Sequence, residues 1–152
     1  DVAGADILTE GVPAYLALAL MDDENQVEVY KNYQLVEYRR TRAKIDSKEY
    51  SLLDSNGEDY VRHKSIVTFL EIENRIGRQA LVTALAVAYQ NALRSPEALL
   101  HPRKVVGEIV AASPVEERDA VRKMFETLEK LPGDEDDNDA VAAATRPSAK
   151  SG

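Results

Sequence analysis

Few side chains in this sequence have the types and spacing that acid–base or metal chemistry requires. His63 and His101 are far apart, and neither belongs to a His-x-x-x-His or Glu-x-x-His arrangement. A metal site built on them would need carboxylates brought in by the fold. Glu71 and Glu73 are close together, but positions two apart on a helix point about 200° away from each other. We therefore expect no catalytic residues and no bound metal, and we interpret both histidines as surface or capping residues.

No sequence signature of an enzyme accompanies these residues. The chain has no Gly-rich phosphate loop, no nucleophile elbow and no Walker-type lysine. It contains no cysteine, which excludes disulfides, thiolate zinc sites and cysteine nucleophiles, and which is compatible with a reducing cytosol. We expect a protein that uses no cofactor, is not an enzyme and works by binding other molecules.

A local excess of basic residues is the clearest charge feature of a chain whose formal net charge is −8. Two interpretations are open. Lysine and arginine near a helix C-terminus complement the helix dipole, whereas the same residues on a surface can bind phosphate groups or an acidic partner. Under the second interpretation the candidate nucleic-acid-binding residues are Lys31, Arg39, Arg40, Arg42, Lys44 and Lys48.

Residues 133–152 differ in composition from the rest of the chain. They begin with an acidic run and continue with Ala, Thr, Ser, Pro and Lys. Such a segment has too little apolar area to offset the entropy of ordering, so we expect it to be disordered when alone. It would either keep the protein in solution or mask the basic residues until a polyanion displaces it.

Apolar residues at helical spacing organise the first part of the chain. Pro13 suits the start of a short helix that ends near Met21. Asp22 and Asp23 lie where an N-cap and first-turn acids belong, ahead of a longer helix that runs to Ile45. This longer helix is apolar on more than one side, so we expect contacts on two of its sides. One apolar stripe contains Val27, Tyr30, Tyr33 and Val36, and three further apolar residues lie outside that stripe, namely Val29, Leu35 and Tyr38.

Turn and capping signals divide the rest of the chain. Asp54-Ser55-Asn56-Gly57 is typical of a turn, and a helix is predicted from Asp59 with a possible break at Gly77. Pro102 suits the first turn of a further helix, and Ser113-Pro114-Val115-Glu116 has the pattern of a capping box that opens the last one. About six helices and no strand are predicted, so the expected fold class is all-α.

The helix predicted after Gly77 carries a narrow seam of small and medium apolar side chains. Residues recurring at three and four positions form one face of a helix, and small side chains let a second helix approach closely. We predict that this seam forms contacts between copies of the chain, with interface residues Leu81, Ala84, Leu85, Ala88 and Ala92.

These features divide the chain into three parts. Residues 1–11 contain two glycines and no periodicity, and we expect a flexible arm that orders only against something else. Residues 12–132 form a single helical domain, and residues 133–152 form the acidic tail. No apolar run reaches the roughly 18–20 residues of a membrane span, so we expect no membrane partner.

Residues 13–85 contain, in this order, Val29-Tyr30-Lys31-Asn32-Tyr33, Tyr60-Val61-Arg62-His63-Lys64 and the segment from Glu73 to Leu81. This order of features resembles the small-subunit family of tailed-phage terminases. A Tyr-rich helix runs into a basic stretch, a turn at Asn56-Gly57 follows, and a long helix closes the pattern. The sequence departs from the family at Lys64, where proline is usual, and at Arg78-Gln79, which replace a Thr/Ser-Pro step.

This resemblance implies an oligomeric, often ring-shaped DNA-recognition factor without ATPase activity, which passes viral DNA to a separate motor-nuclease subunit. The expected function is therefore that of a non-catalytic DNA-packaging adaptor in the cytoplasm of a host cell. A ring would make a weak basic patch multivalent despite the negative net charge. Two alternatives remain open, namely a structural virion or connector-type assembly protein and a helical small subunit of a nucleic-acid-guided complex.

Overall fold

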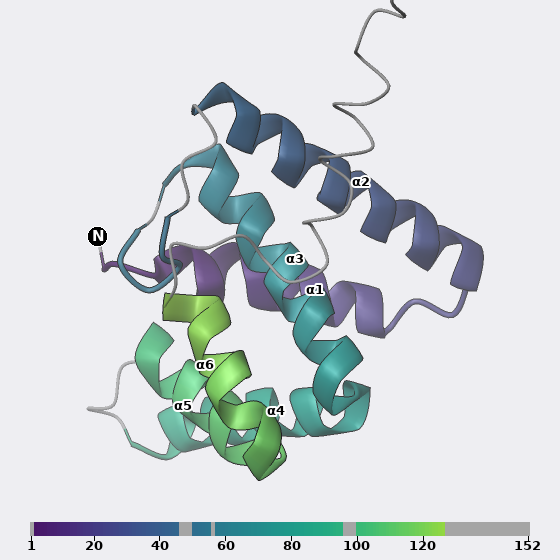
Figure 1. Cartoon of the computed structure of the whole chain (residues 1–152). Helices are drawn as coiled ribbons and strands as arrows, with labels where there is room; N and C mark the ends of the chain where they lie inside the picture. The colour runs from purple at the N-terminus through teal and green to yellow at the C-terminus, as the bar shows by residue number, and fades with distance from the viewer. Residues whose placement is uncertain (1, 46–49, 56, 96–99, 127–152) are drawn as a thin grey trace, which may run out of the picture.

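The computed structural model describes residues 2–45, 50–55, 57–95 and 100–126, and within these ranges the chain is helical without any strand (Figure 1). The expected all-α class is confirmed. These described ranges contain six α-helices, a π-helical segment that precedes the first of them and a 3-10 segment that precedes the last. In chain order the elements are η1 (Ile7–Gly11), α1 (Val12–Ala19), α2 (Glu24–Lys44), α3 (Asp59–Ile76), α4 (Arg78–Arg94), α5 (Pro102–Ala112), η2 (Val115–Glu117) and α6 (Arg118–Glu126).

Helix ends that depend on local chemistry lie where the sequence predicts them. The Asp23 carboxylate caps α2 and accepts hydrogen bonds from the backbone N–H groups of Asn25 at 2.9 Å and Gln26 at 3.2 Å. Gly77 has a φ of +89°, a conformation that side-chain-bearing residues rarely adopt, and it separates α3 from α4. Pro102 is the first residue of α5.

Helix α3 forms the centre of the structure, with α2 and α1 on one part of it and α4 and α6 meeting it elsewhere (Figure 1). It is buried around most of its circumference. Aromatic contacts join it to its neighbours: the Phe69 ring stacks on Tyr15 of α1 and meets Phe125 of α6 edge to face, each with 5.9 Å between ring centroids. A second pair, Tyr38 and Tyr60, stacks at 5.6 Å between α2 and α3. Among the described residues, no helix is long and apolar enough to cross a membrane.

The expectation of a flexible arm at residues 1–11 is wrong for the part that the structure describes. Ile7 in η1 is completely buried, and the backbone N–H of Gly4 donates a 3.0 Å hydrogen bond to the carbonyl of Ser55. Gly11 packs directly on Ser65 and Phe69 of α3. The segment lacks a simple apolar period because it is wound partly as a π-helix and is buried against α3. The predicted tail, residues 133–152, lies outside the described residues.

The predicted capping box at Ser113 is also wrong. The Ser113 hydroxyl donates a 2.7 Å hydrogen bond backwards to the carbonyl of Ile109, at the end of α5. The following turn is the 3-10 segment η2, with Pro114 at its N-cap and no side-chain capping bond. Serine hydroxyls bond readily to the carbonyl four residues earlier, and here that contact closes α5 and does not open α6.

The apolar seam of α4 belongs to the core of its own chain. Leu81, Ala84, Leu85 and Ala88 are buried, and α4 packs along α5, whose inward residues include Val105 and Ile109. The small side chains therefore permit close approach of α5 and do not serve a second copy. The prediction that these residues contact another copy of the chain is therefore wrong for Leu81, Ala84, Leu85 and Ala88. Ala92 is half-buried at the end of the seam.

Candidate interaction surface

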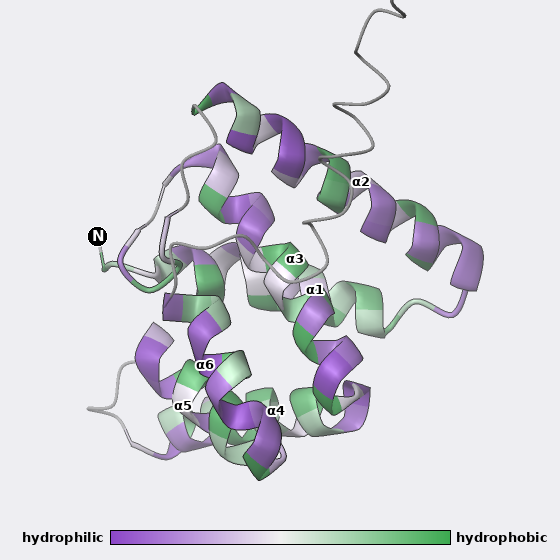
Figure 2. Cartoon of the chain, viewed as in Figure 1, coloured by the Kyte–Doolittle hydropathy of each residue, from purple (hydrophilic) through white to green (hydrophobic). Residues whose placement is uncertain are grey.

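Helix α2 has two faces of opposite character. Its inner face packs on α3 through buried side chains such as Gln34 and Tyr38. Its outer face carries three apolar side chains in solvent: Val29 is 70% exposed, Tyr33 55% and Val36 57%. These positions are four and three residues apart and so form one stripe on the helix. Figure 2 shows hydrophobic residues recurring along α2 among hydrophilic ones.

The outer face continues onto the turn between α1 and α2. Leu20 is 81% exposed and Met21 is also exposed, although both are large apolar side chains. A shallow, mainly apolar groove begins there and runs along the first half of the helix; it is lined by Met21, Asn25, Gln26, Val29, Tyr30 and Tyr33. Contiguous exposed apolar surface of this kind marks interaction sites in proteins more often than single exposed residues do.

Charge is distributed unevenly along α2. Acidic residues, Asp22 and Asp23 among them, precede and open the helix, and basic residues gather in its last two turns. Arg40 is exposed and forms a two-pronged contact with Glu37, its Nε lying 3.1 Å from both carboxylate oxygens. This hydrogen bonding lowers the pKa of the Glu37 carboxyl and raises the pKa of the Arg40 guanidinium. Lys44 is exposed at the end of the helix.

The other predicted DNA-binding residues have varied surroundings. Lys31 lies 3.8 Å from Glu28 one turn earlier, and Arg39 is half-buried. Lys48 lies outside the described residues. The exposed members of the predicted set that the structure brings together at one end of α2 are therefore Arg40 and Lys44, with Arg39 beside them.

Arg42 is the clear exception, and its assignment as a DNA-binding residue is wrong. Its side chain is only 3% exposed and lies on the α3-facing side of α2. The guanidinium carbon is 5.3 Å from the centre of the Tyr38 ring, and Nη1 is 3.5 Å from the Tyr38 hydroxyl. A guanidinium held over an aromatic face inside a helix interface stabilises the packing and is inaccessible to phosphate groups.

The two histidines have structural partners. His63 Nδ1 lies 2.8 Å from Gln34 Oε1, which joins α3 to α2, and partial burial lowers the pKa of the imidazole. His101 caps α5, its Nδ1 accepting a 3.2 Å hydrogen bond from the backbone N–H of Arg103. Among the described residues, no group of three or more His, Cys, Asp or Glu side chains is arranged to hold a metal ion.

Glu73 and Lys64 illustrate polar residues used for packing. Glu73 Oε2 accepts a 2.6 Å hydrogen bond from the Tyr15 hydroxyl and lies 3.4 Å from Arg78 Nε. Lys64, which stands where the terminase family usually has proline, is completely buried, and its Nζ donates a 2.9 Å hydrogen bond to the carbonyl of Tyr50. Both arrangements join separate elements of the fold.

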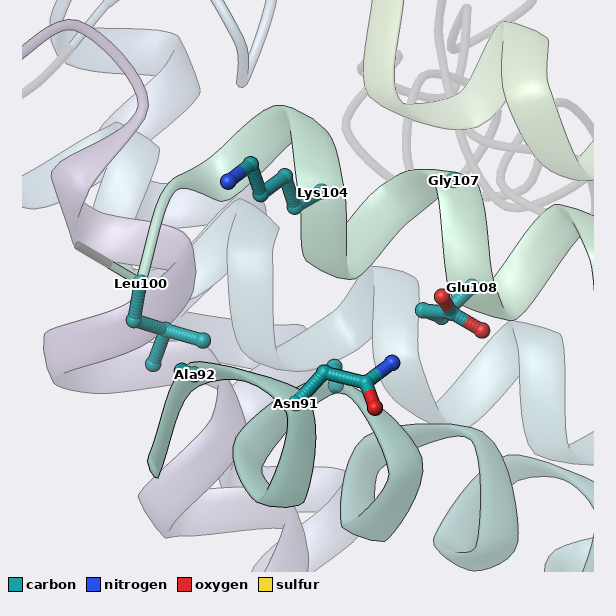
Figure 3. Close-up of a pocket in the computed structure, with 7 residues that line it drawn as sticks. Asn91, Ala92, Leu100, Lys104, Gly107 and Glu108 are labelled. Carbon is teal, nitrogen blue, oxygen red and sulfur yellow. The ribbon is translucent and has the colours of Figure 1, made fainter. Parts of the chain in front are cut away.

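Further hollows lie away from α2, and two of them are formed by α4 with its neighbours. The pocket in Figure 3 lies between α4 and α5, and the residues along its wall include Asn91, Ala92, Lys104 and Glu108. The polar side chains in its wall are an amide, an amine and a carboxylate from Asn91, Lys104 and Glu108. They do not form the pair of a nucleophile and an adjacent base that covalent catalysis requires. A nearly wholly apolar groove lies between α1 and α4, lined by Val12, Pro13, Leu16, Val82, Leu85, Ala86 and Tyr89.

The sequence predicted a second apolar face on α2 but not which residues compose it. The three-residue spacing places Tyr33 and Val36 in one stripe with Val27 and Tyr30, yet Val27 is buried and Tyr30 half-buried. The exposed stripe combines Tyr33 and Val36 with Val29. Three- and four-residue steps separate these three positions, but the buried positions Gln34, Tyr38 and Thr41 have the same spacing, so periodicity alone does not show which face is exposed.

No protein-family model, curated protein or solved structure matches this chain.

Proposed function

We propose that this protein is a non-catalytic assembly protein that binds further copies of its own chain through the outer face of α2. The observation that carries this proposal is the exposed stripe of Val29, Tyr33 and Val36, on the side of the helix opposite its core contacts. Burying one such side chain is worth about 1.5–3 kcal/mol. Burying this apolar surface in an interface would therefore lower the free energy relative to leaving it in water. A structural virion or connector-type subunit is one protein of this class.

The native mass of the particle, measured over a dilution series, tests the proposal. The wild-type chain should form dimers or larger assemblies, and a Val29→Lys/Val36→Lys variant should shift toward the monomer. Because both positions are exposed, the double variant should retain its helical circular dichroism. Val115→Lys is a matched control, since Val115 is 74% exposed but lies on η2. A wild-type chain that stays monomeric at every concentration would remove the proposal.

A second candidate function is the DNA-packaging adaptor implied by the terminase resemblance. The observation that favours it is the basic end of α2, where Arg40 and Lys44 are exposed with Arg39 beside them. Assembly through a surface that leaves this end of α2 free would present several such ends to one duplex, so modest affinity per copy would suffice. In that function the assembled protein would also engage a motor-nuclease subunit.

The salt dependence of DNA binding tests this second function. Replacing Arg39, Arg40 and Lys44 with Gln should flatten the decrease of affinity with salt, because fewer counterions are released on binding. A control that removes the same charge from other helices replaces the exposed Arg94, Arg103 and Arg122. Equal salt dependence in the two triple variants would count against DNA binding by this end of α2.

A further inference from the structure

The exposed side of α2 has the spacing of a two-helix seam. Gln26, Val29, Tyr33, Val36 and Arg40 are separated by steps of three, four, three and four residues, and all five are exposed. This alternation keeps side chains facing a single partner helix over several turns. The centre of the seam is apolar and its two ends are polar, as in an interface whose middle excludes water.

The charges at the two ends of this seam determine which partner fits it. Asp22 and Asp23 lie at the start of α2, and Arg40 and Lys44 lie in its last two turns. A second α2 running parallel would place acids beside acids and bases beside bases. A second α2 running antiparallel would place the acidic end of each helix beside the basic end of the other, which is favourable.

The positions of the seam residues are also consistent with twofold symmetry. Tyr33 is midway between Gln26 and Arg40 along the sequence, so an antiparallel arrangement pairs the apolar centres and the oppositely charged ends at the same time. In a twofold interface each copy contributes the same surface, so a self-complementary pattern on one helix is sufficient. No separate partner surface is needed.

We infer that two copies of the chain pair through antiparallel α2 helices, with the two Tyr33 side chains beside the twofold axis. Val29 of each copy then lies near Val36 of the other, and Asp22 lies near Lys44 of the other. This inference rests on the proposed self-assembly and specifies its geometry. It also places Arg40 and Lys44 within the interface, so that helix pairing and DNA compete for the same cations.

Single cysteines test the pairing, because the natural chain contains none. Tyr33→Cys should form a disulfide-linked dimer under mild oxidation, since the two sulfurs would face each other across the axis. Gln26→Cys alone should not, because its equivalent would lie about 21 Å away along the helix, at 1.5 Å per residue. A mixture of Gln26→Cys and Arg40→Cys chains should form a mixed dimer.

The possible failures are distinguishable. If native mass shows oligomers but Gln26→Cys links to itself, or Tyr33→Cys does not link, the antiparallel geometry is overturned and self-assembly stands. If the chain is monomeric throughout, the proposed function fails as well. Charge reversal gives an independent measurement: Asp22→Lys should weaken dimerisation roughly tenfold, and adding Lys44→Asp should restore it. Lack of restoration would overturn the predicted charge pairing.

Discussion

The Tyr15 hydroxyl donates a 2.6 Å hydrogen bond to Glu73 Oε2, although the two residues belong to different helices and lie far apart in the sequence. Tyr15 is completely buried in α1, and Glu73 lies in the last turn of α3. The same carboxylate oxygen is 3.4 Å from Arg78 Nε at the start of α4. One carboxylate thus joins three helices at the point where α3 ends and α4 begins.

This contact predicts a loss of stability in alkali. Burial, and then the hydrogen bond to Glu73, raise the pKa of the Tyr15 phenol above its ordinary value of about 10. The stability contributed by the neutral phenol is therefore fully present below about pH 10 and is lost as the pH rises above it. Tyr15→Phe should cost about 1–2 kcal/mol at neutral pH, because a partly buried hydrogen bond to a carboxylate is removed.

Urea unfolding of the wild type and Tyr15→Phe at about pH 8 and about pH 11 measures this effect, on either side of the ordinary tyrosine pKa. The wild type should lose more unfolding free energy between these pH values than the variant. Some loss should remain in the variant, since burial also raises the pKa of Tyr30 and Tyr89. Identical losses in the two proteins would show that the Tyr15 phenol does not carry the effect.

Gly11 is predicted to tolerate no larger side chain. A Cβ at this position would meet Ser65 Oγ and would lie 2.9 Å from Phe69 Cε2. Gly11→Ala should therefore cost about 1–3 kcal/mol through overpacking. Thermal or urea unfolding measures the change, and Ser65→Ala in the same chain should recover part of it by removing the nearest atom.

Gly107 provides the matched control for this substitution. It is exposed in α5, and a Cβ there would meet nothing within 4 Å. Gly107→Ala should stabilise the chain by about 0.5–1 kcal/mol, because alanine favours the helix and restricts the unfolded state. If both alanines changed stability in the same direction, close packing of the first segment on α3 would not explain the effect at Gly11.

The sequence predicted those parts of the fold that depend on neighbouring residues. Asp23, Gly77 and Pro102 act on the backbone within a turn of their own position, so their effects are visible without tertiary structure. Segments whose conformation is decided by distant contacts were predicted wrongly. Gly11 and Ser113 are examples, because burial on α3 orders the first segment and Ile109 takes the serine hydroxyl.

The sequence predicted that α2 carries an interaction surface, but it did not identify the residues of that surface, because distant contacts decide which residues are buried. Periodicity identifies apolar and basic faces on helices, but it does not show which face meets the core. Leu81 and Ala84 have the spacing of an interface and are buried in the core of their own chain, whereas Val29 and Val36 are left in solvent. One basic cluster likewise divides between a buried Arg42 and an exposed Arg40, two positions apart on the helix.

His63 predicts a loss of stability in mild acid. Burial lowers the pKa of its imidazole below the ordinary value of about 6.5, an effect to which Arg62 adds and which Glu37 and Asp59 oppose. The folded state therefore favours the neutral imidazole of His63. The resulting contribution to the free energy of unfolding is fully present above about pH 6.5 and is lost as the pH falls below that value. His63→Gln should lose less unfolding free energy than the wild type between about pH 7 and about pH 5.

The titration of the His63 ring protons by NMR measures the same quantity directly. Its midpoint should lie below the ordinary value for histidine, and a midpoint at or above that value would contradict the prediction. The Gln34 contact gives a second check, since His63 Nδ1 lies 2.8 Å from Gln34 Oε1. Gln34→Ala should open this part of the α2–α3 interface to water and move the midpoint of His63 upward.

Arg40 and Arg42 give the sharpest separation of surface from core within α2. Arg42→Ala removes a buried guanidinium from the Tyr38 ring and should cost about 2 kcal/mol of unfolding free energy, through lost packing and cation–π attraction. Arg40→Ala removes an exposed ion pair and should leave the stability of the monomer unchanged. Urea unfolding of a dilute, monomeric sample measures both variants without interference from assembly.

The effects of these two variants on binding should be the reverse of their effects on stability. Arg40→Ala should weaken self-association or DNA binding, because its side chain reaches the outer face, whereas Arg42→Ala should affect binding only as far as it unfolds the helix. Arg42→Lys refines this comparison, since lysine keeps the charge but loses the planar group that lies over Tyr38. If Arg42→Lys left stability intact and weakened binding as strongly as Arg40→Ala, Arg42 would belong to the interaction surface after all.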